Sequence, residues 1–161
     1  MNEFPEMQGV LGGYFAESQG FEKEVCLAIS EHYLPSGLNS RTPKNNYSIA
    51  LSLSDKLDTL VGFFGLDLVP TSSKDPYALR RITIGLIKLI IENKKSFKLK
   101  ELIDYSCQLY NNQSINFDRK LIHTNLSVFI IDRLKNYMKE KGIRQDIIES
   151  SLINFDLNNI F

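Results

Sequence analysis

Apolar residues recur at helical spacing along nearly the whole chain, and this periodicity is the strongest constraint on its fold. The clearest example lies in residues 47–64, where one stripe is made of Ile49, Leu53, Leu57, Leu60 and Phe64. Residues three or four positions apart share one face of a helix, which is then buried against a neighbour. No segment is predicted as a strand. The sequence therefore predicts an all-α fold, a helical bundle.

Residues that begin or end helices divide this pattern further. Helices are predicted over residues 5–18, 21–33, 47–64, 75–93, 97–110, 117–141 and 144–152. We expect Pro5 in the first turn of the first helix and Gly142 as a C-cap. Asp75 is predicted as an N-cap, with Pro76 at the first helical position. The apolar face of helix 117–141 is predicted to contain Leu121, Leu126, Phe129, Ile130 and Leu134.

The composition is ordinary for a soluble globular protein. The 161 residues are 43% hydrophobic, and 19 basic residues balance 19 acidic ones. The first residues are polar and acidic, and no apolar run is long enough to cross a bilayer, so we expect a cytoplasmic protein with no membrane partner. The two cysteines, Cys26 and Cys107, lack the spacing of a zinc site and are predicted to be buried free thiols.

Two aspartates in the predicted helix 47–64 are candidates for chemistry. Asp55 and Asp58 are three residues apart and share one side of that helix, whereas Lys56 points elsewhere. Paired carboxylates can hold a divalent metal or act as acid and base. Metal-dependent phosphohydrolases of the HD superfamily add an adjacent His-Asp pair, which this chain lacks. A structural role therefore fits better, in which the aspartates bond helix ends or pair with Arg80 or Arg81.

Other candidates for catalysis are weak. His32 closes a predicted helix, where the helix dipole favours a cation, so we expect it to cap the helix C-terminus. No serine has a histidine base at recognisable spacing. Basic residues are concentrated in residues 80–100, and they could contact the phosphates of a polyanion without reading its sequence.

Several segments, in order, resemble the beta subunit of bacterial tetrameric glycine–tRNA ligase. They are EFPEMQGVLG at 3–12, EHYLP at 31–35, SDKLDTLVGFFG at 54–65, KDPYALRR at 74–81, FIIDRL at 129–134 and GIRQDII at 142–148. Motifs of this length in this order are specific. The resemblance extends over residues 3–152, nearly the whole chain.

This resemblance implies a part in the ATP-dependent attachment of glycine to its tRNA. In that family the alpha subunit is similar to a class II catalytic core and carries ATP and glycine, and the beta subunit is similar to a tRNA-binding partner. We therefore expect glycine tRNA and the alpha subunit as partners. The chain itself is expected to hold no catalytic residue, metal or cofactor, and to be inactive alone. The resemblance implies tRNA contacts by Arg80, Arg81, Lys88, Lys94 and Lys95.

The beta subunit is several times longer than this chain, so the resemblance implies an internal fragment. Residues 1–68 are then expected to be an incomplete HD-like helical segment. Residues 69–161 are expected to be a helical linker or bundle segment that precedes an absent anticodon-binding domain. Asp55 and Asp58 would be structural, or relics of a metal site. Two alternatives stay open, namely a degenerate HD-type phosphohydrolase and a non-functional helical fragment.

Overall fold

The computed structural model describes residues 7–153 and 155–160. Within these ranges the chain forms helices and no strand, which confirms the all-α prediction; its HD-like character stays a prediction. The elements are α1 (Val10–Ser18), α2 (Lys23–Glu31), α3 (Asn46–Gly65), α4 (Leu79–Asn93), α5 (Leu99–Asn112), α6 (Arg119–Glu140), α7 (Gln145–Ser151) and the 3-10 helix η2 (Leu157–Asn159). Pro5 lies outside the described residues.

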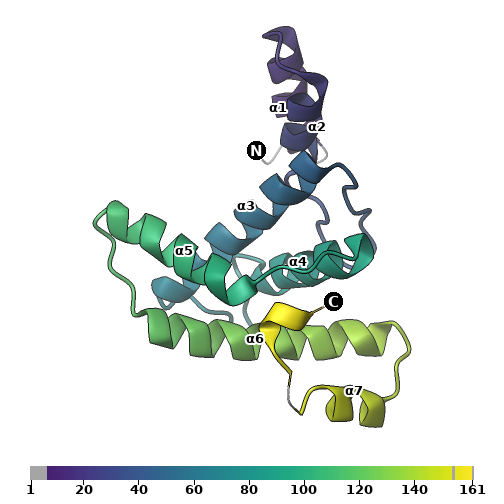
Figure 1. Ribbon diagram of the computed structural model, residues 1–161, viewed down its shortest axis with the longest axis vertical. Coiled ribbons are helices and arrows are strands. Elements are labelled where there is room, and N and C mark those ends of the chain that lie inside the picture. Colours follow the sequence, from purple (N-terminus) through teal and green to yellow (C-terminus); the bar gives the residue numbers. More distant parts are fainter. Residues whose placement is uncertain (1–6, 154, 161) are drawn as a thin grey trace.

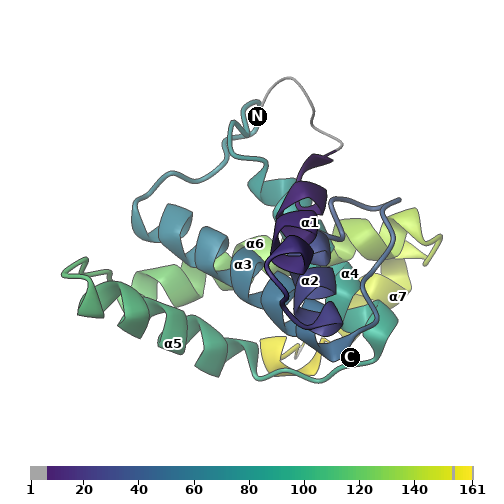
Figure 2. The same ribbon diagram turned by 90° about the horizontal axis from the view of Figure 1, so that it is seen from above.

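Helices α3 to α6 form the body of the molecule, and α1 and α2 form a hairpin that projects from it (Figure 1). Helix α1 packs mainly against α2, and α2 packs on α3. Seen from above, the hairpin lies over the middle of the body, and α5 extends furthest to the left (Figure 2). Helix α7 packs on α6, and η2 packs on α5. The hairpin therefore meets the body mainly through α2.

One apolar core joins α3, α4, α5 and α6. The stripe predicted for α3 is buried along its whole length. On α6 the predicted face is partly wrong, because Leu121 is exposed and Ile122 is buried in its place. Ile122 begins a row at four-residue spacing that continues through Leu126 and forms the face toward the core. The core spans the domain boundary predicted at residues 68 and 69, which stays a prediction.

The start of α4 differs from the prediction. Pro76 is not the first helical residue, since α4 begins at Leu79 and is preceded by Ala78 in the left-handed conformation, with φ of 56°. Asp75 still caps the helix, because its carboxylate accepts hydrogen bonds from the N–H groups of Leu79 (2.8 Å) and Arg80 (3.0 Å). The intervening turn packs on α3, where the rings of Tyr77 and Phe63 have centroids 4.3 Å apart.

Other predictions about local structure are confirmed. Gly142 follows α6 with φ of +79°, as the predicted C-cap glycine requires. Cys26 and Cys107 are free and buried, and burial raises the pKa of the Cys107 thiol. Among the described helices, none combines the length and the apolar character needed to cross a membrane.

Candidate functional site

A buried lysine holds together the segments that carry the sequence motifs. Lys56 of α3 is only 3% exposed, although it carries an ammonium group. Its Nζ donates to the carbonyl oxygens of His32 (3.4 Å), Tyr33 (3.3 Å) and Leu34 (3.1 Å). It also lies 3.1 Å from the Oγ of Ser52. A cation at the C-terminal end of α2 is favoured by the helix dipole, so Lys56 ties the hairpin to the body.

The environment of Lys56 disfavours its charge. Burial lowers the pKa of Lys56 from 10.5 to about 8, and the neighbouring carboxylate of Asp55 opposes part of that shift. Helix α4 contacts the Lys56 side chain at Gly85. A Cβ at that position would clash with the carbonyl oxygen of Pro35 and would lie 3.0 Å from the Cε of Lys56. A glycine there allows α4 to pack directly on the segment that follows α2.

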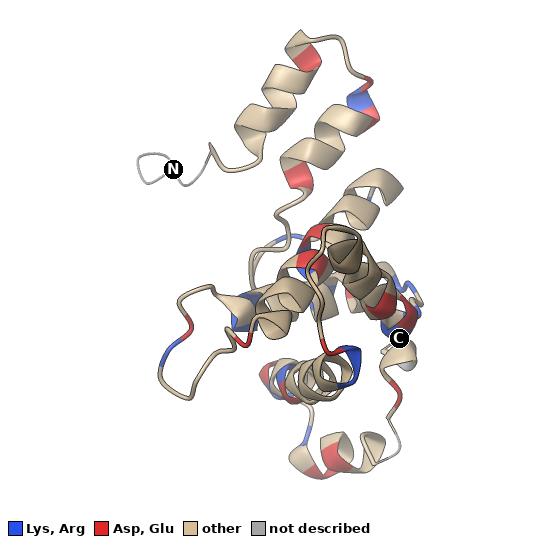
Figure 3. Ribbon diagram, turned by 90° about the vertical axis from the view of Figure 1, so that its left-hand side faces the viewer, with Lys and Arg blue, Asp and Glu red and all other residues tan. Residues whose placement is uncertain are grey.

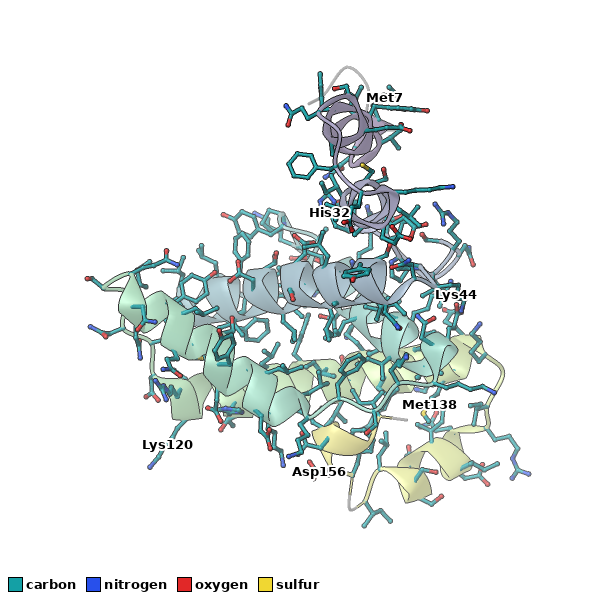
Figure 4. The ribbon with its side chains drawn as sticks, turned by 45° about the horizontal axis from the view of Figure 1, so that its top comes forward. Met7, His32, Lys44, Lys120, Met138 and Asp156 are labelled. Carbon is teal, nitrogen blue, oxygen red and sulfur yellow. The ribbon has the colours of Figure 1, made fainter. Side chains whose placement is uncertain are left out.

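A small polar cleft opens next to this contact. We call it the motif cleft, and its lining includes the polar residues Gln8, His32, Tyr33, Asp55, Lys56, Thr59 and Arg81. Its volume is about 170 Å³. These residues come from four of the sequence motifs, namely residues 3–12, 31–35, 54–65 and 74–81. His32 lies at the junction between the hairpin and the body (Figure 4). Folding thus brings together motifs that are up to about 70 residues apart in the chain.

His32 has the capping role predicted from its position. It is the C-cap residue of α2, and its Nδ1 lies 2.7 Å from the carbonyl oxygen of Ile29. Because a carbonyl can only accept a hydrogen bond, Nδ1 carries the proton in this contact. In the neutral ring Nε2 is then an acceptor, and it has no partner among the described residues.

Asp55 and Asp58 lie one helical turn apart on α3. Asp55 is half-buried at the motif cleft, and Asp58 is exposed. Both also line a larger, mainly apolar groove of about 470 Å³ between α3 and α5. Neither forms an ion pair within the described residues, so the pairing with Arg80 or Arg81 that we expected is not present.

The described ranges contain no group of three or more His, Cys, Asp or Glu side chains that could hold a metal ion. His123 of α6 is engaged elsewhere, because it contacts the carboxylate of Asp104 at 2.8 Å. Nothing in the geometry therefore favours the HD-type phosphohydrolase alternative. Whether the two aspartates of α3 are relics of a metal site stays a prediction.

The basic residues singled out from the sequence are divided between the two ends of α4. Arg80 and Arg81 lie in its first turn, and Lys94 and Lys95 follow its last residue. The separation is roughly 20 Å for a 15-residue helix that rises about 1.5 Å per residue. Elsewhere on the body, basic and acidic segments alternate, whereas the hairpin is mainly acidic (Figure 3). The five cations therefore do not form one continuous patch.

Lys88, between these two pairs, is not a surface cation. The residue is 6% exposed, and its Nζ donates to the carbonyl oxygens of Leu38 (2.6 Å) and Ser40. It also lies 3.6 Å from the carboxylate of Glu92. The buried ammonium group holds the loop between α2 and α3 against α4, and this position leaves it no access to a phosphate.

Arg80 and Arg81 have different surroundings. Arg80 is half-buried and donates to the carbonyl oxygen of Thr71, which fixes it against the connector before α4. Arg81 is exposed and forms no ion pair with any described residue. The aliphatic stem of Arg81 packs near Gly37, and its side chain forms part of the motif cleft. A guanidinium group without an acidic partner can bind an anion.

Comparison with known proteins agrees with this arrangement of motifs. A family profile described as "Glycyl-tRNA synthetase beta subunit" matches residues 1–153. The chain belongs to this family. Its match covers all four motifs that line the motif cleft.

Curated members of the glycyl-tRNA synthetase beta subunit family are similar over almost the whole chain. The glycine–tRNA ligase beta subunit of Clostridioides difficile is 37% identical over 160 residues, which is 99% of this chain and 23% of the relative. Those of Rhodospirillum centenum and a Ruegeria species are 41% and 39% identical over 150 residues, or 93% of this chain and 20% of each relative. The chain thus spans about a fifth of the length of these family members.

The residue at the centre of the site was missed from the sequence. Lys56 was predicted only to point away from Asp55 and Asp58, and its burial among the motif residues of this synthetase family was not predicted. A signal was present in the spacing, since Ser48, Ser52 and Lys56 follow one another at four-residue intervals beside the apolar stripe of α3. All three are buried. Small polar residues in line with a lysine can provide room and a hydrogen-bond partner for its ammonium group.

Proposed function

We propose that this chain acts as a tRNA-contacting and scaffolding part of a glycine–tRNA ligase beta subunit. It would contribute to the ATP-dependent attachment of glycine to its tRNA without providing a catalytic residue. The observation that supports this proposal most is the pair Arg80 and Arg81, which the Asp75 cap holds in the first turn of α4. Arg81 is exposed and free of acidic partners among the described residues.

Contacts of this kind give affinity and orientation rather than sequence recognition. Lys94 and Lys95, at the other end of α4, are exposed and can reach a second group of phosphates on an extended polyanion such as tRNA. Lys88 would instead contribute to the scaffold. Asp55 and Asp58 are proposed as structural or site-lining residues, with no metal of their own.

Partners and location follow from the same proposal. The alpha subunit would bind ATP and glycine and perform the chemistry, and the present chain would hold no cofactor. Glycine tRNA is the proposed nucleic-acid partner, and the cytoplasm, where tRNA is charged, is the proposed location. On this basis the isolated chain is expected to show no aminoacylation activity.

Binding of the 161-residue chain to glycine tRNA tests the proposal. We expect salt-dependent binding that Arg80→Glu/Arg81→Glu weakens, with the slope of log Kd against log salt falling by about 2, or one per lost phosphate contact. Lys120→Glu/Lys139→Glu is the matched control, since it makes the same charge change at exposed positions of α6. Equal effects of the two double variants, or no binding at low salt, would refute a tRNA contact at the start of α4.

A further inference from the structure

The motif cleft has polar side chains with free hydrogen-bonding capacity. The side chains of Gln8, Asp55 and Thr59 make no hydrogen bond to a described residue. Gln8 precedes α1, and Asp55 and Thr59 lie on successive turns of α3. The Nε2 of His32 is likewise free. A surface that gathers unused donors and acceptors from three segments is arranged for a ligand rather than for packing.

The charges around the cleft favour an anionic ligand. Two cationic residues line the cleft, namely Arg81, which is exposed, and Lys56, which is buried. Asp55 is the one carboxylate among the described residues of this wall, so two cations face one anion. A ligand with a phosphate group and a hydrogen-bond donor would satisfy both Arg81 and Asp55.

The size of the cleft and its aromatic residues further restrict the class of ligand that it can hold. A volume of about 170 Å³ is below that of most small-molecule pockets, so the cleft can enclose one flat ring of a larger ligand. The rings of His32 and Tyr33 stand edge to face at its side, with centroids 6.4 Å apart. Proteins recognise unpaired bases of RNA by stacking them on tyrosine, histidine or arginine and by bonding to their polar edges.

A neighbouring groove gives the polynucleotide a path beyond the cleft. It shares Ala78 and Arg81 with the motif cleft and is also lined by Arg80 and Gly37. The two arginines therefore lie along one continuous surface that leads out of the cleft. A ligand that extends past one nucleotide has a second cation next to it, which a free mononucleotide would not use.

From these observations we infer that the motif cleft holds one unpaired nucleotide of the bound RNA, with its phosphate on Arg81, its base beside His32 and Tyr33, and the base edge on Asp55. This inference rests on the proposed tRNA contact and adds a specific pocket to it. A carboxylate only accepts hydrogen bonds, and the single N–H donor on the pairing edge of uracil is flanked by two carbonyl oxygens that repel a carboxylate. Asp55 therefore favours bases with an exocyclic amino group over uracil.

Short RNA oligomers test this recognition. Binding of the 161-residue chain is measured for single-stranded oligomers of cytosine, adenine or uracil and for a duplex of the same length. We expect the single strands to bind more tightly than the duplex, and cytosine or adenine to bind about tenfold more tightly than uracil, the scale of one good base-edge contact. Equal affinity for all the single strands, or tighter binding of the duplex, would overturn the inference.

Two aspartates one turn apart provide a matched pair of variants. Asp55→Asn removes the acceptor-only group from the cleft and should abolish the preference over uracil. Asp58→Asn makes the same chemical change outside the cleft, and this variant should retain the preference for cytosine and adenine over uracil. Neither carboxylate has an ion-pair partner among the residues described, so Asp58→Asn should unfold at the wild-type midpoint. Asp55→Asn also removes the negative charge beside the buried ammonium group of Lys56 and should unfold slightly below that midpoint. Identical behaviour of the two variants would contradict the assignment.

Nuclear magnetic resonance can locate the bound oligomer independently. The chain has only two histidines, so their ring signals are easily separated. Addition of single-stranded RNA should shift the ring signals of His32 and leave those of His123, which is on α6, in place. In one outcome, Arg80→Glu/Arg81→Glu weakens tRNA binding but the ring signals of His32 do not shift when RNA is added. The proposed function would then stand, and the inference of a nucleotide pocket would be refuted. If tRNA does not bind at all, both the proposed function and the nucleotide pocket are refuted.

Discussion

The buried ammonium group of Lys56 gives the sharpest prediction about stability. Its pKa is about 8 in the folded protein, against 10.5 for an ordinary lysine. The unfolded chain therefore binds this proton more tightly, and it holds more protons than the folded chain between pH 8 and 10.5. Stability from this residue rises with pH across that window. At pH 7 both states are protonated, and the charge costs the fold about 3 kcal/mol.

Replacement of Lys56 by methionine removes this pH dependence. Between pH 7 and pH 10 the wild-type protein should gain about 2–3 kcal/mol relative to Lys56→Met, as most of the charge cost disappears. Burial also raises the pKa values of Cys107, Tyr110 and Tyr137, which lowers stability at high pH. These effects are the same in the wild-type protein and in Lys56→Met, so they cancel in the difference between the two free energies of unfolding.

Urea unfolding of both proteins at pH 7, 8, 9 and 10 measures this difference directly. Lys120→Met serves as the control, because Lys120 is exposed on α6 and its replacement should shift stability equally at every pH. A constant difference between wild type and Lys56→Met from pH 7 to pH 10 would show that Lys56 is hydrated like a surface lysine. The reasoning from its burial would then be refuted.

Three further changes test the surroundings of the site. Asp75→Ala removes the acceptor for two N–H groups of α4 and should lower the free energy of unfolding by about 1–2 kcal/mol in urea, with Asp75→Asn less harmful; an unchanged midpoint would mean that another group caps α4. Gly85→Ala forces a methyl group against Pro35 and should cost about 1–3 kcal/mol by the same measurement, and wild-type stability would contradict the close packing. Cys107 should react with a thiol reagent more slowly than Cys26, because it is fully buried in the core; equal rates by mass spectrometry would argue against that burial.

The helices could be predicted wherever their apolar residues repeat over several turns. The stripe of α3 is buried as the spacing indicated, because a helix face that is apolar for about four turns avoids water only by packing against neighbouring helices. The start of α4 could not be predicted in this way. Asp75 and Pro76 have the sequence of an N-cap and first helical residue, but packing of Tyr77 on Phe63 turns the chain once more before the helix begins.

The candidate site was only partly visible in the sequence. The motif residues were recognised, but their convergence on one cleft depends on how α2, α3 and α4 pack. The two buried lysines show the same limit. Lys56 and Lys88 each bond to backbone carbonyls more than 20 residues away, so their burial follows from contacts that local spacing does not contain. A lysine in an apolar run is compatible with either a solvated or a buried ammonium group.

The attachment of the hairpin has a consequence for how the molecule opens. A unit that meets the body mainly through one helix can separate with less free energy than complete unfolding requires. The carbonyl oxygens of residues 32–34 are the acceptors of Lys56, so lifting the hairpin would expose that ammonium group to water. Hydration would relieve the cost of its charge, most strongly at neutral pH. We therefore expect separation at residues 32–34 to cost more free energy as the lysine loses its proton.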